Sequence, residues 1–77
     1  MKNNGDIKPG EPKWITMLRM LRVAESSPAG YSEAVEKAVE KLLDDGEKVH
    51  FFKLNEARGS VRDGEIEYQV VLEVAVE

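Results

Sequence analysis

The chain is short, mildly acidic and free of cysteine. It has 77 residues, one histidine and a formal net charge of −4, which leaves room for a single domain with a small core. These numbers exclude disulfides and cysteine-based zinc sites, and a single histidine gives no reason to expect a metal centre.

The charge and hydropathy patterns also narrow the range of partners. Lysine and arginine are scattered along the chain, whereas nucleic-acid-binding domains gather them in one patch. No apolar run approaches the ~20 residues that cross a bilayer, and residues 1–13 lack the apolar stretch of a signal peptide. We therefore expect a cytoplasmic protein that contacts neither nucleic acid nor membrane. Association with further copies is the remaining common way to stabilise so small a domain.

Residues 1–13 have the composition of a flexible polar arm. Prolines and glycines are spread among polar residues, and almost nothing there can be buried. The folded domain is expected over 14–77. Its first element is predicted as a strand over 14–24, WITMLRMLRVA, because apolar residues without a helical stripe are followed at once by a Ser-Ser-Pro turn signal.

A helix is predicted over 31–45. Its apolar residues recur with a period near 3.6 and form one face, which comprises Ala34, Val35, Ala38, Val39, Leu42 and Leu43. Ser27 is the expected N-cap, with Pro28 at the first helical position. Gly46 lies where a C-terminal cap belongs.

Two strands joined by a tight turn are predicted for the second half of the chain. Asp63-Gly64 separates the segments 49–61 and 65–76, and Asp-Gly between two strand-like runs is a strong hairpin signal. The last segment alternates, with one apolar face made of Ile66, Tyr68, Val70, Leu72, Val74 and Val76. The element order is therefore β-α-β-β, an α+β fold in which one helix packs on one face of a three-stranded antiparallel sheet.

The register of the hairpin requires one extra residue. A regular ladder from a two-residue loop would place Lys53 opposite Val74 and turn Phe52 to the polar side. An extra residue in the first hairpin strand gives instead the pairs Phe52–Val74, Lys53–Glu73 and Leu54–Leu72. We therefore predict a β-bulge, and Gly59 is the natural place for it.

With that bulge the two faces of the sheet differ in character. The helix is expected to cover Phe52, Leu54, Tyr68, Val70, Leu72 and Val74. The opposite face is mixed and carries Val49, Phe51, Lys53, Gln69, Val71 and Ala75. No second element of the chain is expected to cover this face, so it is predicted to meet another subunit or a ligand. The alternative is an ordinary half-solvated face with one exposed aromatic residue.

Two stretches of the sequence resemble the dodecin family. Residues 18–35, LRMLRVAESSPAGYSEAV, are similar to the first strand of the family, its Ser-Ser-Pro turn and the start of its helix. Residues 49–74 resemble the second half of the family's pattern, and the matching residues are Phe51-Phe52, Arg58-Gly59, Asp63-Gly64 and Tyr68-Gln69-Val70. The resemblance covers 18–77 and implies a dodecin-like fold.

The resemblance also implies a ligand and an assembly. Dodecins are flavin-binding storage or buffering proteins that form hollow dodecamers, in which flavins stack between tryptophans and a glutamine hydrogen-bonds the ring edge. Phe51 stands at the tryptophan position and Gln69 matches the glutamine, so both are expected to contact a flavin such as riboflavin, FMN or lumichrome. Some dodecin-like proteins are associated instead with calcium or other ligands. The alternative is therefore a structural homo-oligomer that binds calcium or no small ligand.

The remaining polar residues give no sign of catalysis. Glu36, Glu40 and Asp44 form an acidic stripe that is expected to be solvated, and His50 is expected at the surface. Arg58 and Glu56 are candidates for an ion pair, either between subunits or on the surface. No nucleophile lies in a recognisable pattern with a base, and no glycine-rich phosphate loop is present. The sequence therefore predicts a binding protein and not an enzyme.

Overall fold

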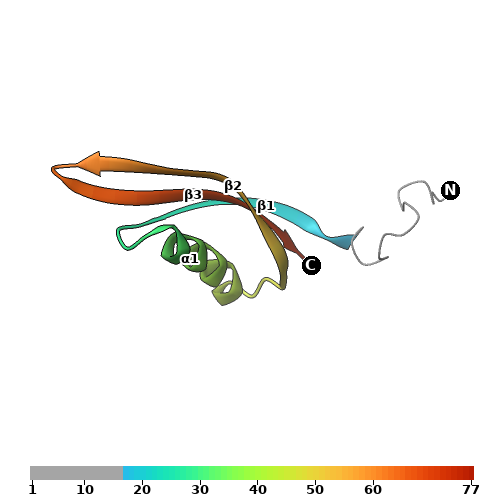
Figure 1. Cartoon of the computed structure of the whole chain (residues 1–77). Helices are drawn as coiled ribbons and strands as arrows, with labels where there is room; N and C mark the ends of the chain where they lie inside the picture. The colour runs from blue at the N-terminus through green and yellow to red at the C-terminus, as the bar shows by residue number, and fades with distance from the viewer. Residues whose placement is uncertain (1–16) are drawn as a thin grey trace.

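The computed structural model describes residues 17–77. Strand β1 (Arg19–Ser27) is followed by helix α1 (Tyr31–Asp44) and by strands β2 (Val49–Arg62) and β3 (Glu65–Val76). The strands form one antiparallel sheet in the order β1-β3-β2, and α1 lies along one side of it (Figure 1). The predicted α+β fold is confirmed, while the predicted arm over 1–13 lies outside the described residues.

Strand β1 starts and ends later than predicted, since Met17 and Leu18 precede its first residue. The expected end was Ala24, but the ladder continues until Ser26 pairs with Gln69 and Ser27 pairs with Tyr68. Pro28 ends the strand because it has no N–H to donate to the sheet. The Ser-Ser-Pro signal therefore marks the turn correctly, but both serines belong to the strand.

The two ends of α1 are formed in different ways. The N-cap is Gly30 (φ 149°) and not Ser27 as predicted. Ser27 is buried one turn earlier, where its Oγ accepts the Ala29 N–H at 3.0 Å and donates to the Glu33 carboxylate. At the other end the prediction is confirmed, because Gly46 has φ 89° and its N–H donates to the Leu43 carbonyl in a Schellman motif.

The hairpin between β2 and β3 has the predicted turn. Asp63 has φ 53° and Gly64 has φ 82°, and positive φ at both central residues defines a type I′ turn. Arg62 pairs with Glu65 next to the turn, and Val61 pairs with Ile66 one position further along the strands. Since β1 ends opposite Tyr68, the rest of the hairpin projects beyond β1 as a two-stranded ribbon (Figure 1).

The predicted bulge exists, but it lies at Asn55 and not at Gly59. The predicted pairs of Phe52 with Val74, Lys53 with Glu73 and Leu54 with Leu72 are all confirmed, and the register shifts between Leu54 and Glu56. Gly59 pairs regularly with Tyr68. A Cβ at Gly59 would lie 3.5 Å from the Glu67 carbonyl and 3.7 Å from the Tyr31 hydroxyl, which are ordinary van der Waals distances, so Gly59 is a regular strand residue and does not form the bulge.

A second irregularity, between Val49 and Phe51, was not predicted. It moves Val49 to the helix side of the sheet, where Val49 packs at the margin of the core. The expectation that Val49 shares a face with Phe51 is therefore wrong, because the extra residue, His50, reverses the side-chain parity once more.

The core lies between α1 and the central strand. Its buried members are Ala34, Ala38, Leu42, Val70, Leu72, Val74 and Val76. The helix packs mainly over β1 and β3, so the β2 residues Phe52 and Leu54 remain 47% exposed each. The helix therefore covers less of the sheet than predicted, and Leu43, expected on its apolar face, is 52% exposed.

Candidate ligand site on the open face of the sheet

The sheet face turned away from α1 is called here the open face. Its members come in cross-strand rows, Met20–Ala75–Phe51, Arg22–Glu73–Lys53, Ala24–Val71–Glu56 and Ser26–Gln69–Arg58. Alternation of side chains along antiparallel strands places all of these residues on the same side. The structure thus confirms the open face for Phe51, Lys53, Gln69, Val71 and Ala75.

One end of the open face is apolar. Ala75 is buried between its ladder neighbours Met20 and Phe51, which are 52% and 43% exposed. An aromatic ring that offers so much surface is suited to stacking against a flat partner or to packing in an interface.

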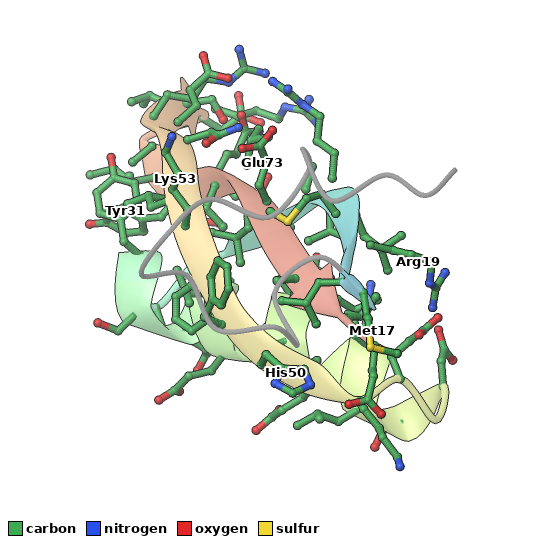
Figure 2. The ribbon with its side chains drawn as sticks, turned by 90° about the vertical axis from the view of Figure 1, so that its right-hand side faces the viewer. Met17, Arg19, Tyr31, His50, Lys53 and Glu73 are labelled. Carbon is green, nitrogen blue, oxygen red and sulfur yellow. The ribbon has the colours of Figure 1, made fainter. Side chains whose placement is uncertain are left out.

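The next row is a line of alternating charge. Glu73 lies on the central strand, opposite Lys53 of β2 (Figure 2). On its other side it pairs with Arg22 of β1. Opposite charges in directly facing positions stabilise a sheet by about 0.2–1 kcal/mol per pair. The row separates the apolar end of the open face from its polar end.

The polar end holds a shallow groove of about 320 Å³. Its lining comprises Ala24, Glu25, Ser26, Glu56, Arg58, Gln69, Val70 and Val71. Within it the Arg58 Nε–H donates to the Gln69 Oε1 at 3.0 Å, and an Arg58 terminal nitrogen lies 3.8 Å from the Glu56 carboxylate. Gln69 is half-buried, while Arg58 and Glu56 have side-chain exposures of 66% and 52%. The groove therefore offers an amide and a guanidinium beside a small apolar floor.

The two predicted site residues do not meet within one subunit. Phe51 pairs with Ala75, which lies six residues along β3 from Gln69. At about 3.4 Å per residue, this separation is roughly 20 Å. The structure places both residues on the predicted face but at opposite ends of it.

Arg58 is a site residue that the sequence reasoning missed. With the bulge at Gly59, Arg58 would lie opposite Tyr68, whereas the bulge at Asn55 places it opposite Gln69. The sequence holds one signal that favours the observed position. Only a bulge before Ala57 turns the small residues Ala57 and Gly59 to the helix side and Arg58 to the open face.

Two further charged side chains form ion pairs apart from the Arg58–Gln69 pair. Glu25 faces α1, where its carboxylate lies 2.5 Å from the Lys41 ammonium with its side chain 13% exposed. The hydrogen bond from Lys41, together with the Ser26 backbone N–H, lowers the pKa of Glu25 below its ordinary value against the opposing effect of burial. His50 lies at the far end of the sheet (Figure 2). Its Nε2 is 3.1 Å from the Glu77 carboxylate.

Glu36, Glu40 and Asp44 are exposed, as expected for a solvated helix face. Within residues 17–77 no three histidine, cysteine or acidic side chains gather as a metal site would require. Over the same part of the chain, no helix combines the length and apolar character of a membrane span.

The fold and the open face together define a small βαββ subunit with one covered and one uncovered sheet face. The model of the dodecin family matches residues 17–77. The chain belongs to the dodecin family.

Solved structures agree with this assignment. The dodecin from Streptomyces coelicolor is 30% identical, with 77% of this chain and 86% of that chain covered at a TM-score of 0.71. The dodecin from Streptomyces davaonensis is 25% identical, with coverages of 77% and 88% and the same TM-score. A calcium dodecin from Mycobacterium tuberculosis, described as calcium chelating, is 24% identical, covers 75% and 84%, and shares the fold at a TM-score of 0.70. No curated protein matches the chain.

Proposed function

We propose that the protein is a homo-oligomeric flavin-binding dodecin that sequesters or stores riboflavin, FMN or a related flat ligand. The observation that carries this proposal is the position of Phe51 and Gln69. They are partly exposed on the same uncovered face, yet they lie roughly 20 Å apart along the strands. A site that uses both residues is therefore completed between subunits, and we propose a dodecamer as the assembly.

The chemistry of the two residues suits a flavin. A flat ring stacks on the face of Phe51, and an aromatic pair contributes about 0.5–1.5 kcal/mol beyond the burial of its surface. The Gln69 amide is suited to hydrogen-bond the polar edge of the ring. An amide, a guanidinium and an aromatic ring supply contacts for binding without a nucleophile, so we propose binding and not catalysis.

The exposed apolar residues support the assembly. Met20 and Phe51 are partly exposed on the open face, and Phe52 and Leu54 are 47% exposed beside the helix. Apolar surface on both sides of β2 is what subunit contacts would cover, and a chain of this size gains stability by association.

Flavin titration tests the proposal. Native protein should quench riboflavin, FMN or lumichrome fluorescence, and Phe51→Trp should bind more tightly because it offers a larger ring. Gln69→Ala should weaken binding by about 0.5–1.5 kcal/mol, the usual net contribution of a hydrogen bond. Ser32→Ala, at an exposed position of α1 on the other side of the sheet, is a control that should change nothing. Native mass spectrometry should report a large assembly that retains ligand. An assembled protein that leaves flavin fluorescence unchanged, also as Phe51→Trp, would contradict the flavin proposal.

The alternative function is a structural shell that binds calcium or no small ligand. It is favoured by the fold shared with the calcium dodecin of Mycobacterium tuberculosis. Calcium takes 6–8 oxygen ligands, and residues 17–77 of one subunit gather no group of three acidic side chains. Calcium would therefore need ligands from several subunits. Calorimetric titration with Ca²⁺, in parallel with riboflavin, decides between the two functions.

A further inference from the structure

We infer that Arg58 is a positioning residue, which fixes the orientation of the Gln69 carboxamide and so determines the kind of ring edge that the site accepts. The juxtaposition that carries this inference is the 3.0 Å hydrogen bond from Arg58 Nε–H to Gln69 Oε1. The choice of ligand rests on the proposed function, whereas the orientation of the amide does not.

The chemistry of the pair fixes the direction of the bond. A guanidinium has five N–H donors and no acceptor, while an amide has an oxygen that accepts and an NH2 group that donates. Only the oxygen of Gln69 can therefore face Arg58. The same conclusion holds however the two ends of the amide are assigned, because a flipped amide would oppose donor to donor.

The backbone and a neighbour hold Arg58 in place. Arg58 and Gln69 are directly opposite residues of the β2–β3 ladder, so their Cα atoms are held at a fixed spacing by the sheet. The Glu56 carboxylate lies 3.8 Å from a terminal nitrogen of Arg58 on the same strand. Gln69 is half-buried beside Ser26 of β1, which limits how far its amide can swing. The orientation is thus set before a ligand arrives, which lowers the entropic cost of binding.

The fixed oxygen determines what the amide offers to a ligand. One of the two lone pairs of Oε1 accepts from Arg58, whereas both donors of the NH2 group stay available for a ligand, so the oriented amide acts mainly as a donor. It requires an acceptor, such as a carbonyl oxygen or an unprotonated ring nitrogen. The site should therefore favour flat rings with carbonyl groups on the edge, as in riboflavin, over flat rings whose edge carries only donors, as in protonated proflavine.

The first experiment examines the ligand-free full-length protein. In ¹H–¹⁵N spectra, the Arg58 Nε–H should exchange with water several-fold more slowly in the native protein than in Gln69→Leu, which removes the acceptor. Arg22, on the same face, is the internal control, and its Nε–H exchange should be the same in both proteins. Equal exchange of Arg58 in the two proteins would overturn the inference whether or not any flavin binds.

The second experiment measures selectivity with riboflavin and proflavine. Arg58→Met leaves the amide free to turn, so riboflavin affinity should fall about twofold to tenfold, the contribution of one hydrogen bond. The preference for riboflavin over proflavine should decrease with it. Arg22→Met removes the same charge from the same face and should leave that preference unchanged. Arg58→Lys, which keeps charge and a donor, should restore part of it.

Each outcome of the titration has one meaning. Equal changes in Arg58→Met and Arg22→Met would show a role of charge alone and overturn the inference. If native protein binds neither dye while Arg58 Nε–H is protected in the exchange experiment, the proposed flavin function fails and the orientation of Gln69 by Arg58 stands. Both variants must retain the native assembly mass, which native mass spectrometry checks.

Discussion

The two faces of the sheet are built on opposite principles. On the helix side, β3 contributes Val70, Leu72, Val74 and Val76, all at most 1% exposed. On the open face the same strand carries Gln69, Val71, Glu73 and Ala75. The neighbouring strands add charged side chains and the ring of Phe51 to this face. On the helix side α1 covers the central strand within one chain, although Phe52 and Leu54 of β2 remain exposed. The open face carries ordered polar and aromatic groups. Among residues 17–77, however, no element packs over it in the way that α1 packs over the other side.

This difference separates stability from recognition within a single strand. Odd-numbered and even-numbered residues of β3 belong to different faces, so a substitution should affect either folding or binding according to its parity. Substitutions on the two sides of the sheet test that division.

Truncation of the core residue should have the largest effect. Leu72 is fully buried, so Leu72→Ala should lower the free energy of unfolding by about 2–5 kcal/mol through lost burial and a residual cavity. The adjacent Val71→Ala on the open face is the matched control and should cost less. Denaturant unfolding at one fixed subunit concentration gives the measurement, because association also contributes to stability. Equal losses would show that the open face is as much a core as the helix side.

Removal of a charge on the helix side should have an intermediate, pH-dependent effect. Lys41 lowers the pKa of Glu25 in the folded protein, so the pair stabilises the fold above the unfolded pKa, and this stability is lost as the pH falls through the folded pKa. Glu25→Gln should cost about 1 kcal/mol at neutral pH, the usual value of a hydrogen bond to a partly buried group.

The acid side of the stability curve identifies the responsible residue. Glu25→Gln should flatten the fall of the melting temperature between neutral and acidic pH, because the group that loses its charge is gone. Glu73→Gln on the open face is the control. It retains Glu25, so the part of the decrease in melting temperature that Glu25 causes should remain. An unchanged curve in Glu25→Gln would assign the acid sensitivity elsewhere.

Deletion of the bulged residue should have the smallest effect. Without Asn55, Leu54 still faces Leu72 and Glu56 still faces Val71, so every side chain of β2 keeps its face. The unfolding free energy should change by about 1 kcal/mol or less, since no cavity or unpaired charge arises. Deletion of Gly59 is the contrast. It shifts the pairing of the neighbouring β2 residues by one position and turns their side chains to the other face of the sheet, so it should be more damaging. The reverse ranking of the two deletions would contradict the register.

Much of the fold follows from local sequence patterns. The helix, the Asp63-Gly64 turn and the register of Phe52 to Leu54 were predictable, because glycine positions and apolar spacing act within a few residues. The position of the bulge was not predictable, because an extra residue anywhere between Leu54 and Val61 gives the same pairs for Phe52, Lys53 and Leu54. The choice depends on which β2 side chains face the helix side of the sheet, and the observed register turns Ala57 and Gly59 to that side.

The candidate site was predictable only in part for the same reason. Phe51 and Gln69 were placed on the correct face, since parity alone decides it. Their separation along β3 and the bond from Arg58 depend on the exact register, which composition and spacing left open. The exposure of Phe52 and Leu54 was likewise hidden, because the lateral position of a helix over a sheet is decided by packing and leaves no local signature.

The two irregularities of β2 have a consequence for solubility. β2 is an edge strand, and a long regular edge is a template on which further chains can add without limit. The shifts at His50 and Asn55 divide that edge into the short regular stretches Phe51–Leu54 and Glu56–Arg62, and each bulge adds local twist. A neighbouring strand cannot continue one hydrogen-bonding frame across both shifts. The irregular edge thus protects a small, partly apolar subunit against open-ended fibre growth while leaving closed assembly possible.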